Sequence, residues 1–204
     1  MAFQYAHKCA GDFPTPRKQV LLLTCMDLRL LDNTVAFMNE LNLTNRYDQL
    51  ALAGAALGVL KLDSPPLGAR SQRSNSVWKD VFFHHLQVAI DVLHREIKDV
   101  FILEHRDCGA YKYFHPTHKR PYGSGRKQQK LEAKHHRQQA SRLARRIDAF
   151  CRKQQQEAEA AALTAKRRKH RWQAEQRAEA WKGITTHSFL MDLRGNVKPL
   201  RRKE

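Results

Sequence analysis

The chain has 204 residues, which suits one compact domain with a buried core better than two. Its 37 lysines and arginines outnumber its 20 aspartates and glutamates, so the formal net charge is +17. No apolar run approaches the ~20 residues of a membrane span, the first residues lack the apolar core of a signal peptide, and four cysteines are too few for a disulfide framework. We therefore expect a cytoplasmic protein with reduced thiols.

The first half of the chain shows an alternation of strand and helix patterns. Residues 19–24 form a continuous apolar run, typical of a strand buried on both faces. A helix is expected over about 33–41 and a second short strand over 49–53. Residues 61–76, which are rich in Pro, Gly and Ser, indicate a mobile loop. The apolar stripe of residues 78–95 predicts the clearest helix of the chain.

Further strands are expected in the second half of the chain. Residues 100–103 predict another buried strand directly after the clearest helix. A strand, a helix and a strand in this order are typical of an α/β fold with parallel strands. Residues 184–191 are a later β-type run, and residues 197–200 are expected to pair back onto it after a turn.

Most of the net charge belongs to one segment, residues 119–182, which holds 19 lysines and arginines against 6 aspartates and glutamates. From residue 127 to about residue 181 it contains no Gly or Pro and is rich in Ala, Gln, Arg and Lys, which favours one or two long helices. Trp172 and Trp181 are expected to anchor these helices to the core. The segment is either a solvated helix face or a binding surface for a polyanion, an acidic partner or a membrane surface.

The two best buried strands each end in a group of reactive side chains. Cys25, Asp27 and Arg29 follow the first of them, and His105 and Cys108 follow the second. In parallel α/β sheets, functional sites lie at the carboxyl ends of the strands. The two groups therefore meet if the two strands are neighbours in the sheet.

Three of these side chains form a candidate metal site. Cys25, His105 and Cys108 offer two thiolates and one imidazole, a donor set that suits Zn²⁺. Three protein ligands leave a fourth position open, which is typical of catalytic rather than structural zinc. Zinc in such a site lowers the pKa of a bound water from about 15.7 toward 7. The pair His135 and His136 in the basic segment would bind a metal only adventitiously.

Asp27 and Arg29 stand two residues apart beside this candidate site, and they are suited to a charge-assisted ion pair. In that pair Asp27 stays ionised and can accept a hydrogen bond from zinc-bound hydroxide, which orients the hydroxide toward a substrate. Alternatively, Asp27 itself takes the fourth zinc position and closes the site. A third interpretation is an ion pair with only a structural role.

These motifs resemble those of the β-class carbonic anhydrases. The resemblance rests on a Cys-x-Asp-x-Arg motif that begins at Cys25 and a His-x-x-Cys-Gly motif that begins at His105. It extends to the helix and strand before the second motif, and residues 187–192 resemble the family's last strand. The chain is then one domain, residues 1–204, that differs from the family by the loop at 61–76 and a basic helical insertion at about 117–182.

The resemblance implies a zinc enzyme, a carbonate dehydratase, that interconverts CO2 and bicarbonate. Cys25, His105 and Cys108 would bind the zinc, and Asp27 and Arg29 would form the catalytic dyad. The implied fold is a three-layer α/β domain with a mostly parallel four-stranded sheet, an added antiparallel C-terminal strand and flanking helices. The implied assembly is a homodimer, often paired further into a tetramer.

Two alternatives stay open at this point. Family members commonly show Arg-Asn-Ala-Ala-Asn or Arg-Asn-Ala-Gly-Asn after the second strand, whereas residues 53–57 of this chain read Ala-Gly-Ala-Ala-Leu. Relatives of this fold hydrolyse carbonyl sulfide or carbon disulfide with the same zinc set, and the motifs do not separate these chemistries. The other alternative is a non-catalytic zinc protein whose basic segment at 119–182 binds a polyanion or an acidic partner.

Overall fold

The computed structural model describes residues 19–61, 77–114, 122–123 and 125–200. A five-stranded sheet with the strand order β2-β1-β3-β4-β5 lies at its centre. The first four strands run parallel and the last runs antiparallel to its neighbour, so the predicted sheet is confirmed. The strands are β1 (Gln19–Thr24), β2 (Tyr47–Ala51), β3 (Ile97–His105), β4 (Thr185–Met191) and β5 (Val197–Pro199).

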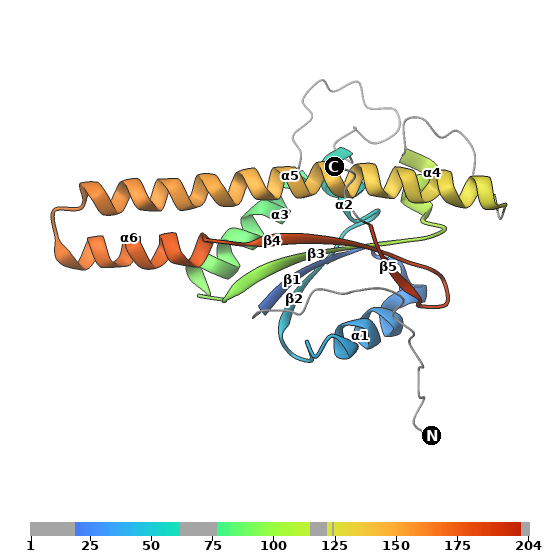
Figure 1. The fold of residues 1–204 in the computed structure, drawn as a ribbon, viewed down its shortest axis with the longest axis horizontal. Helices are drawn as coiled ribbons and strands as arrows, with labels where there is room; N and C mark the ends of the chain where they lie inside the picture. Colours follow the sequence, from blue (N-terminus) through green and yellow to red (C-terminus); the bar gives the residue numbers. More distant parts are fainter. Residues whose placement is uncertain (1–18, 62–76, 115–121, 124, 201–204) are drawn as a thin grey trace.

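Helices cover both faces of the sheet, which gives the protein its three layers (Figure 1). One face carries α1 (Leu31–Glu40), which follows the 3-10 turn η1 (Leu28–Leu30). The other helical segments are α2 (Ala56–Lys61), α3 (Val77–Gln87) with its π-helical continuation η2 (Val88–Val92), α4 (Gly109–Phe114), α5 (Arg126–Thr164) and α6 (Arg168–Trp181). Of these, α2, α3 and α5 cover the opposite face of the sheet.

Successive side chains of the central strands point alternately into the two layers. Leu21 and Leu23 of β1 pack with α2, α3 and α5, whereas Val20 and Leu22 pack with α1. All four side chains are fully buried. A strand that is buried on both faces needs apolar residues at every position, and this is why β1 reads as a continuous apolar run.

The element boundaries differ from the predicted ones in a few places. The strand expected at 100–103 is longer and spans Ile97–His105, and the helix expected at 78–95 ends in its π-helical turn at Val92. Neither α2 nor α4 was predicted, because each has only six residues and so shows no helical period. The predicted loop lies outside the described residues from 62 to 76.

The basic segment forms two helices, α5 and α6, which run antiparallel as a hairpin (Figure 1). The part of α5 over the sheet packs through residues such as Leu143 and Ile147. Trp181 is buried at the end of α6, where its indole N–H donates to Asp91 of η2 at 2.7 Å. The expectation that Trp172 also anchors the helix is wrong, since that side chain is 60% exposed. Within the described residues, no helix combines the length and the apolar character needed to cross a membrane.

Candidate metal centre

The structure brings together the three candidate ligands at the carboxyl ends of β1 and β3, which are neighbours in the sheet. The ligand atoms of Cys25, His105 and Cys108 all lie within 4.8 Å of one another. The two sulfurs are 3.8 Å apart. With Zn–S bonds of ~2.3 Å and tetrahedral angles, two cysteine sulfurs on one zinc ion lie about 3.8 Å apart. The spacing of the cluster therefore fits zinc.

The turn between His105 and Cys108 lets both side chains face one point. Asp107 in this turn has a φ of +59°, a left-handed conformation that aspartate tolerates better than most residues. Its backbone N–H donates to the Glu132 carboxylate at 2.6 Å, and Arg106 donates to the same carboxylate at 2.9 Å. Glu132 belongs to α5, so the long basic helix fixes the shape of the ligand-bearing turn.

Hydrogen bonds orient the first two ligands toward the centre of the cluster. Nδ1 of His105 lies 2.8 Å from the Arg106 carbonyl oxygen, which leaves Nε2 directed at the cluster. That Nε2 is buried and makes no hydrogen bond among the described residues, an unusual state that a metal ion would relieve. Gly54 donates its backbone N–H to the Cys25 sulfur at 3.2 Å. Its φ of +76° and the Ala110 side chain 3.0 Å from where a Cβ would lie both favour glycine here.

The pKa values of the two thiols are shifted in opposite directions, and the shift at Cys25 favours cation binding. A hydrogen bond from Cys108, together with the neighbouring His105, lowers the pKa of Cys25 to about 4. The pKa of Cys108 is raised in turn, because its proton is held by the Cys25 thiolate. The lowered pKa favours the thiolate form of Cys25, and thiolates rather than thiols are the metal ligands.

Asp27 and Arg29 form the ion pair that the sequence suggested. Arg29 donates from Nε and Nη2 to the two carboxylate oxygens of Asp27 at 2.9 and 2.7 Å, and these bonds lower the pKa of Asp27 to about 2. Oδ2 of Asp27 lies 3.7 Å from Nε2 of His105. Arg29 also donates to Asp107 at 3.1 Å, which ties the pair to the ligand-bearing turn.

A small hollow adjoins the cluster on the side of the sheet that α1 covers. It is lined by Cys25, Asp27 and His105 together with Leu30, Thr34, Leu103, Met191 and Thr24. Its room suits a molecule of roughly the size of water. The hollow thus has the candidate ligands and Asp27 on one side and mainly apolar side chains on the other.

Behind the cluster lies a buried polar network that the sequence did not reveal. Glu104 is fully enclosed and accepts hydrogen bonds from the Ala56 N–H and the Tyr111 hydroxyl, both at 3.1 Å. Nδ1 of His136 lies 2.9 Å from its other carboxylate oxygen. Burial raises the pKa of Glu104 to about 8 and lowers that of His136 to about 3. His136 is thus a partner of a buried carboxyl group, a role that the sequence did not suggest.

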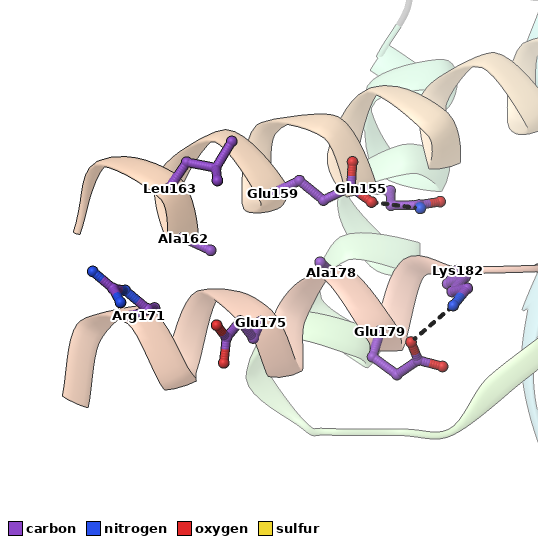
Figure 2. A pocket seen from close by; sticks show the side chains of 9 residues that line it. All are labelled: Gln155, Glu159, Ala162, Leu163, Arg171, Glu175, Ala178, Glu179 and Lys182. Carbon is purple, nitrogen blue, oxygen red and sulfur yellow. Dashed lines mark hydrogen bonds and ion pairs between the residues drawn. The ribbon is translucent and has the colours of Figure 1, made fainter. Parts of the chain in front are cut away.

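A hollow larger than the one beside the cluster lies in the groove between α5 and α6 (Figure 2). Small side chains, Ala162 and Ala178, contribute to its walls. Among its charged groups, Lys182 pairs with Glu179 at 3.4 Å. Its described lining residues include no cysteine or histidine. The residues suited to metal binding therefore lie in the Cys–His–Cys cluster and not in this larger groove.

Comparison with curated proteins finds two uncharacterized relatives. One, from Rickettsia bellii, is 33% identical over 92 residues, and one from Rickettsia conorii is 32% identical over 92 residues. Each match covers 45% of this chain and 48% or 42% of the relative, so the chain spans less than half the length of the curated relatives it matches. No protein-family model matches the chain.

Among solved structures, the chain is similar to β-carbonic anhydrases from two fungi. The enzyme CafA of Aspergillus fumigatus aligns with 93% of this chain and 78% of its own, at 13% identity and a TM-score of 0.41. A tetrameric β-carbonic anhydrase of Sordaria macrospora aligns with 92% and 82%, at 16% identity and a TM-score of 0.41.

Proposed function

We propose that the protein is a zinc-dependent carbonic anhydrase that reversibly hydrates CO2 to bicarbonate. The observation that carries the proposal is the convergence of Cys25, His105 and Cys108, with sulfurs spaced as on tetrahedral zinc, beside the ion pair of Asp27 and Arg29. The resemblance of the two motifs to those of β-class carbonic anhydrases supports it. With that resemblance we also propose a homodimer or tetramer that acts in the cytoplasm.

The chemistry of the donor set fits zinc. Two thiolates and one imidazole are typical zinc ligands, and three protein ligands are typical of catalytic zinc. The orphaned Nε2 of His105 is the nitrogen that would complete the set with Cys25 and Cys108. When bound there, zinc would lower the pKa of a coordinated water and make hydroxide available near neutral pH.

Asp27 is proposed to accept a hydrogen bond beside the metal position and to hold the attacking group in a fixed orientation. Its carboxylate is ionised at neutral pH because Arg29 holds its pKa at about 2. Its Oδ2 lies 3.7 Å from the orphaned nitrogen of His105, so it stands next to the proposed ligands. Both of its oxygens are bonded to Arg29, and we propose that this pair would hold Asp27 back from the metal position and leave the fourth position open.

The wall of the adjoining hollow suits a small apolar substrate. Leu30, Leu103 and Met191 line it beside Asp27 and His105. CO2 is small, linear and without net charge, so it loses little solvation beside such an apolar wall, whereas the hollow itself has room only for a molecule of roughly the size of water. These side chains also limit the water around the reacting carbon, which strengthens the hydrogen bonds made there.

Glu132 is proposed as a positioning residue for the zinc ligands. We expect Glu132→Ala to weaken zinc binding by about 10–100-fold, as loss of an outer partner of a ligand does. The reason is that the turn before Cys108 loses the carboxylate that holds Arg106 and Asp107. Competition with a chelator measures the affinity. Glu157→Ala, which removes an exposed carboxylate of the same helix paired with Lys153, should leave it unchanged; equal affinities of the two variants contradict the role.

The direct test of the proposed activity is stopped-flow CO2 hydration by purified protein of known zinc content, from about pH 6.5 to 9. Turnover well above that of the buffer and proportional to bound zinc supports the proposal. Absence of turnover at full zinc occupancy contradicts it. Hydrolysis of carbonyl sulfide or carbon disulfide without CO2 hydration would assign the same site to a hydrolase instead.

A further inference from the structure

The outer end of the α5–α6 hairpin extends beyond the end of the sheet (Figure 1). We call residues 163–173, where α5 ends and α6 begins, the hairpin tip. All of its side chains are exposed except that of Ala165, which is half-buried. The other end of α6 is held to the core by Trp181 and by Arg177, which both bond to Asp91. The tip is therefore a surface on a rigidly anchored arm.

Five cations crowd the hairpin tip: Lys166, Arg167, Arg168, Lys169 and Arg171. Within the described part of the chain, none of them has an acidic side chain within ion-pair distance. Elsewhere on the molecule, arginines and lysines do pair with carboxylates. The tip thus concentrates positive charge that the protein itself does not neutralise.

This arrangement is unfavourable for the hairpin on its own. Cations in the first turn of a helix are repelled by the positive end of the helix dipole, and acidic residues are preferred there. The first turn of α6 holds Arg168 and Lys169 but no acidic residue and no side-chain cap. Arg168 and Arg171 stand three residues apart in α6, a spacing at which side chains are neighbours on a helix, so their like charges repel. Solvent exposure alone does not explain so many adjacent cations, because they repel one another, whereas a bound polyanion would neutralise their charge.

Two apolar side chains accompany the cations. Trp172 directly follows them and is 60% exposed, and Leu163 is 86% exposed. An exposed indole beside unpaired cations is suited to stacking on an unpaired base while the cations contact phosphates. A membrane surface fits less well, because a helix that lies in a bilayer interface presents a continuous apolar face. Apart from Trp172 and Leu163, the exposed side chains of the tip are polar, charged or small.

We propose that the hairpin tip binds single-stranded nucleic acid, with the five cations on successive phosphates and Trp172 stacked on a base. The binding site is independent of the metal cluster at the carboxyl ends of β1 and β3. Loss of nucleic-acid binding and loss of the proposed CO2 hydration are therefore separable results.

The test is fluorescence anisotropy of labelled oligonucleotides of about 20 nucleotides, as RNA and as DNA, with the full-length chain. Each phosphate contact on a single strand contributes about −0.7 to the slope of log K against log salt, so five contacts predict about −3.5 and a roughly 100-fold loss of affinity between 50 and 200 mM salt. Replacing Lys166, Arg167, Arg168 and Lys169 together by Gln should reduce the slope to about −0.7.

A matched variant separates a local site from the overall charge. Replacing Arg126, Lys127, Lys130 and Lys134 by Gln removes the same four charges from exposed positions at the other end of α5. This variant should retain the affinity and the salt slope. Equal weakening by both quadruple variants overturns the proposal, because binding would then follow the net charge alone.

The role of Trp172 gives an independent readout. Trp172→Ala should weaken binding to the single strand at least about fivefold and leave binding to a duplex of the same sequence unchanged, since stacking on a base needs an unpaired base. Binding to vesicles of phosphatidylserine and phosphatidylcholine without binding to either oligonucleotide overturns the proposal. All substituted side chains are exposed, so the unfolding transitions of the variants should match that of the parent protein.

Discussion

The Cys108→Ser protein should purify with almost no zinc and should hydrate CO2 no faster than the buffer. Serine has nearly the shape of cysteine, but its hydroxyl stays protonated at neutral pH and is a poor zinc ligand. Loss of a direct ligand should exceed the 10–100-fold loss of affinity that follows from removal of an outer partner. Metal analysis of the purified protein and stopped-flow hydration measure the two effects.

Cys151→Ser provides the matched control for this experiment. Cys151 is also buried, but it lies on α5 in the hydrophobic core, and burial raises its pKa to about 12. Its thiol is therefore protonated and unsuited to metal binding, so zinc content and turnover per zinc should be unchanged. A Cys108→Ser protein with full zinc and full turnover would refute the ligand assignment.

The Asp27→Asn protein should retain its zinc and lose about 100-fold in turnover. The amide keeps the size of the side chain but offers one acceptor oxygen in place of two, and removal of one such oriented partner costs roughly this much. Arg29 then lacks its bidentate partner, and the orientation of residue 27 beside His105 is lost. The measurement is turnover per bound zinc, which separates an orienting role from a ligand role.

The pH dependence of the parent protein bears on the same residue. Arg29 lowers the folded-state pKa of Asp27 from its ordinary 3.8 to about 2, so the ion pair contributes stability above about pH 4 that is lost as the pH falls toward 2. Between about pH 6.5 and 9 Asp27 stays ionised, and a pH-dependent rate in that range must report another group.

Asp48→Asn is the control for Asp27→Asn. It removes the carboxylate that pairs with Arg95 on the edge strand β2, and it should change neither the rate nor the zinc content. Unchanged turnover in Asp27→Asn would exclude the orienting role.

The central strands were predictable from the sequence because their physical requirement is local. A strand with helices on both faces needs an apolar side chain at each position, and the run that became β1 shows this directly. The two reactive motifs follow such runs, and parallel strands place their carboxyl ends at one edge. The meeting of Cys25 with His105 and Cys108 was therefore predictable in principle, and the adjacency of β1 and β3 brings it about.

The partners behind the Cys–His–Cys cluster were not predictable, because they come from residues distant in the chain. Glu132 is one acidic residue within a basic helix, and its sequence neighbours give no sign that it bonds to Arg106 and Asp107. His136 reads as part of the same charged helix, yet it packs against Glu104 with no exposed surface. Glu104, near the end of the apolar run of β3, was the one sign in the sequence of this network, since a buried carboxyl group requires hydrogen-bond partners.

The sequence by itself determined the alternation of strands and helices, the candidate ligand set and the ion pair of Asp27 and Arg29, since these depend on local hydrophobic runs and short spacings. Only the tertiary structure decided which side chains of the basic helices are buried. Trp172 and Trp181 lie on the same helix, but one is exposed and the other is buried against Asp91. The reason is that α5 and α6 extend beyond the sheet, and burial of a helix face depends on what it packs against and not on its own pattern.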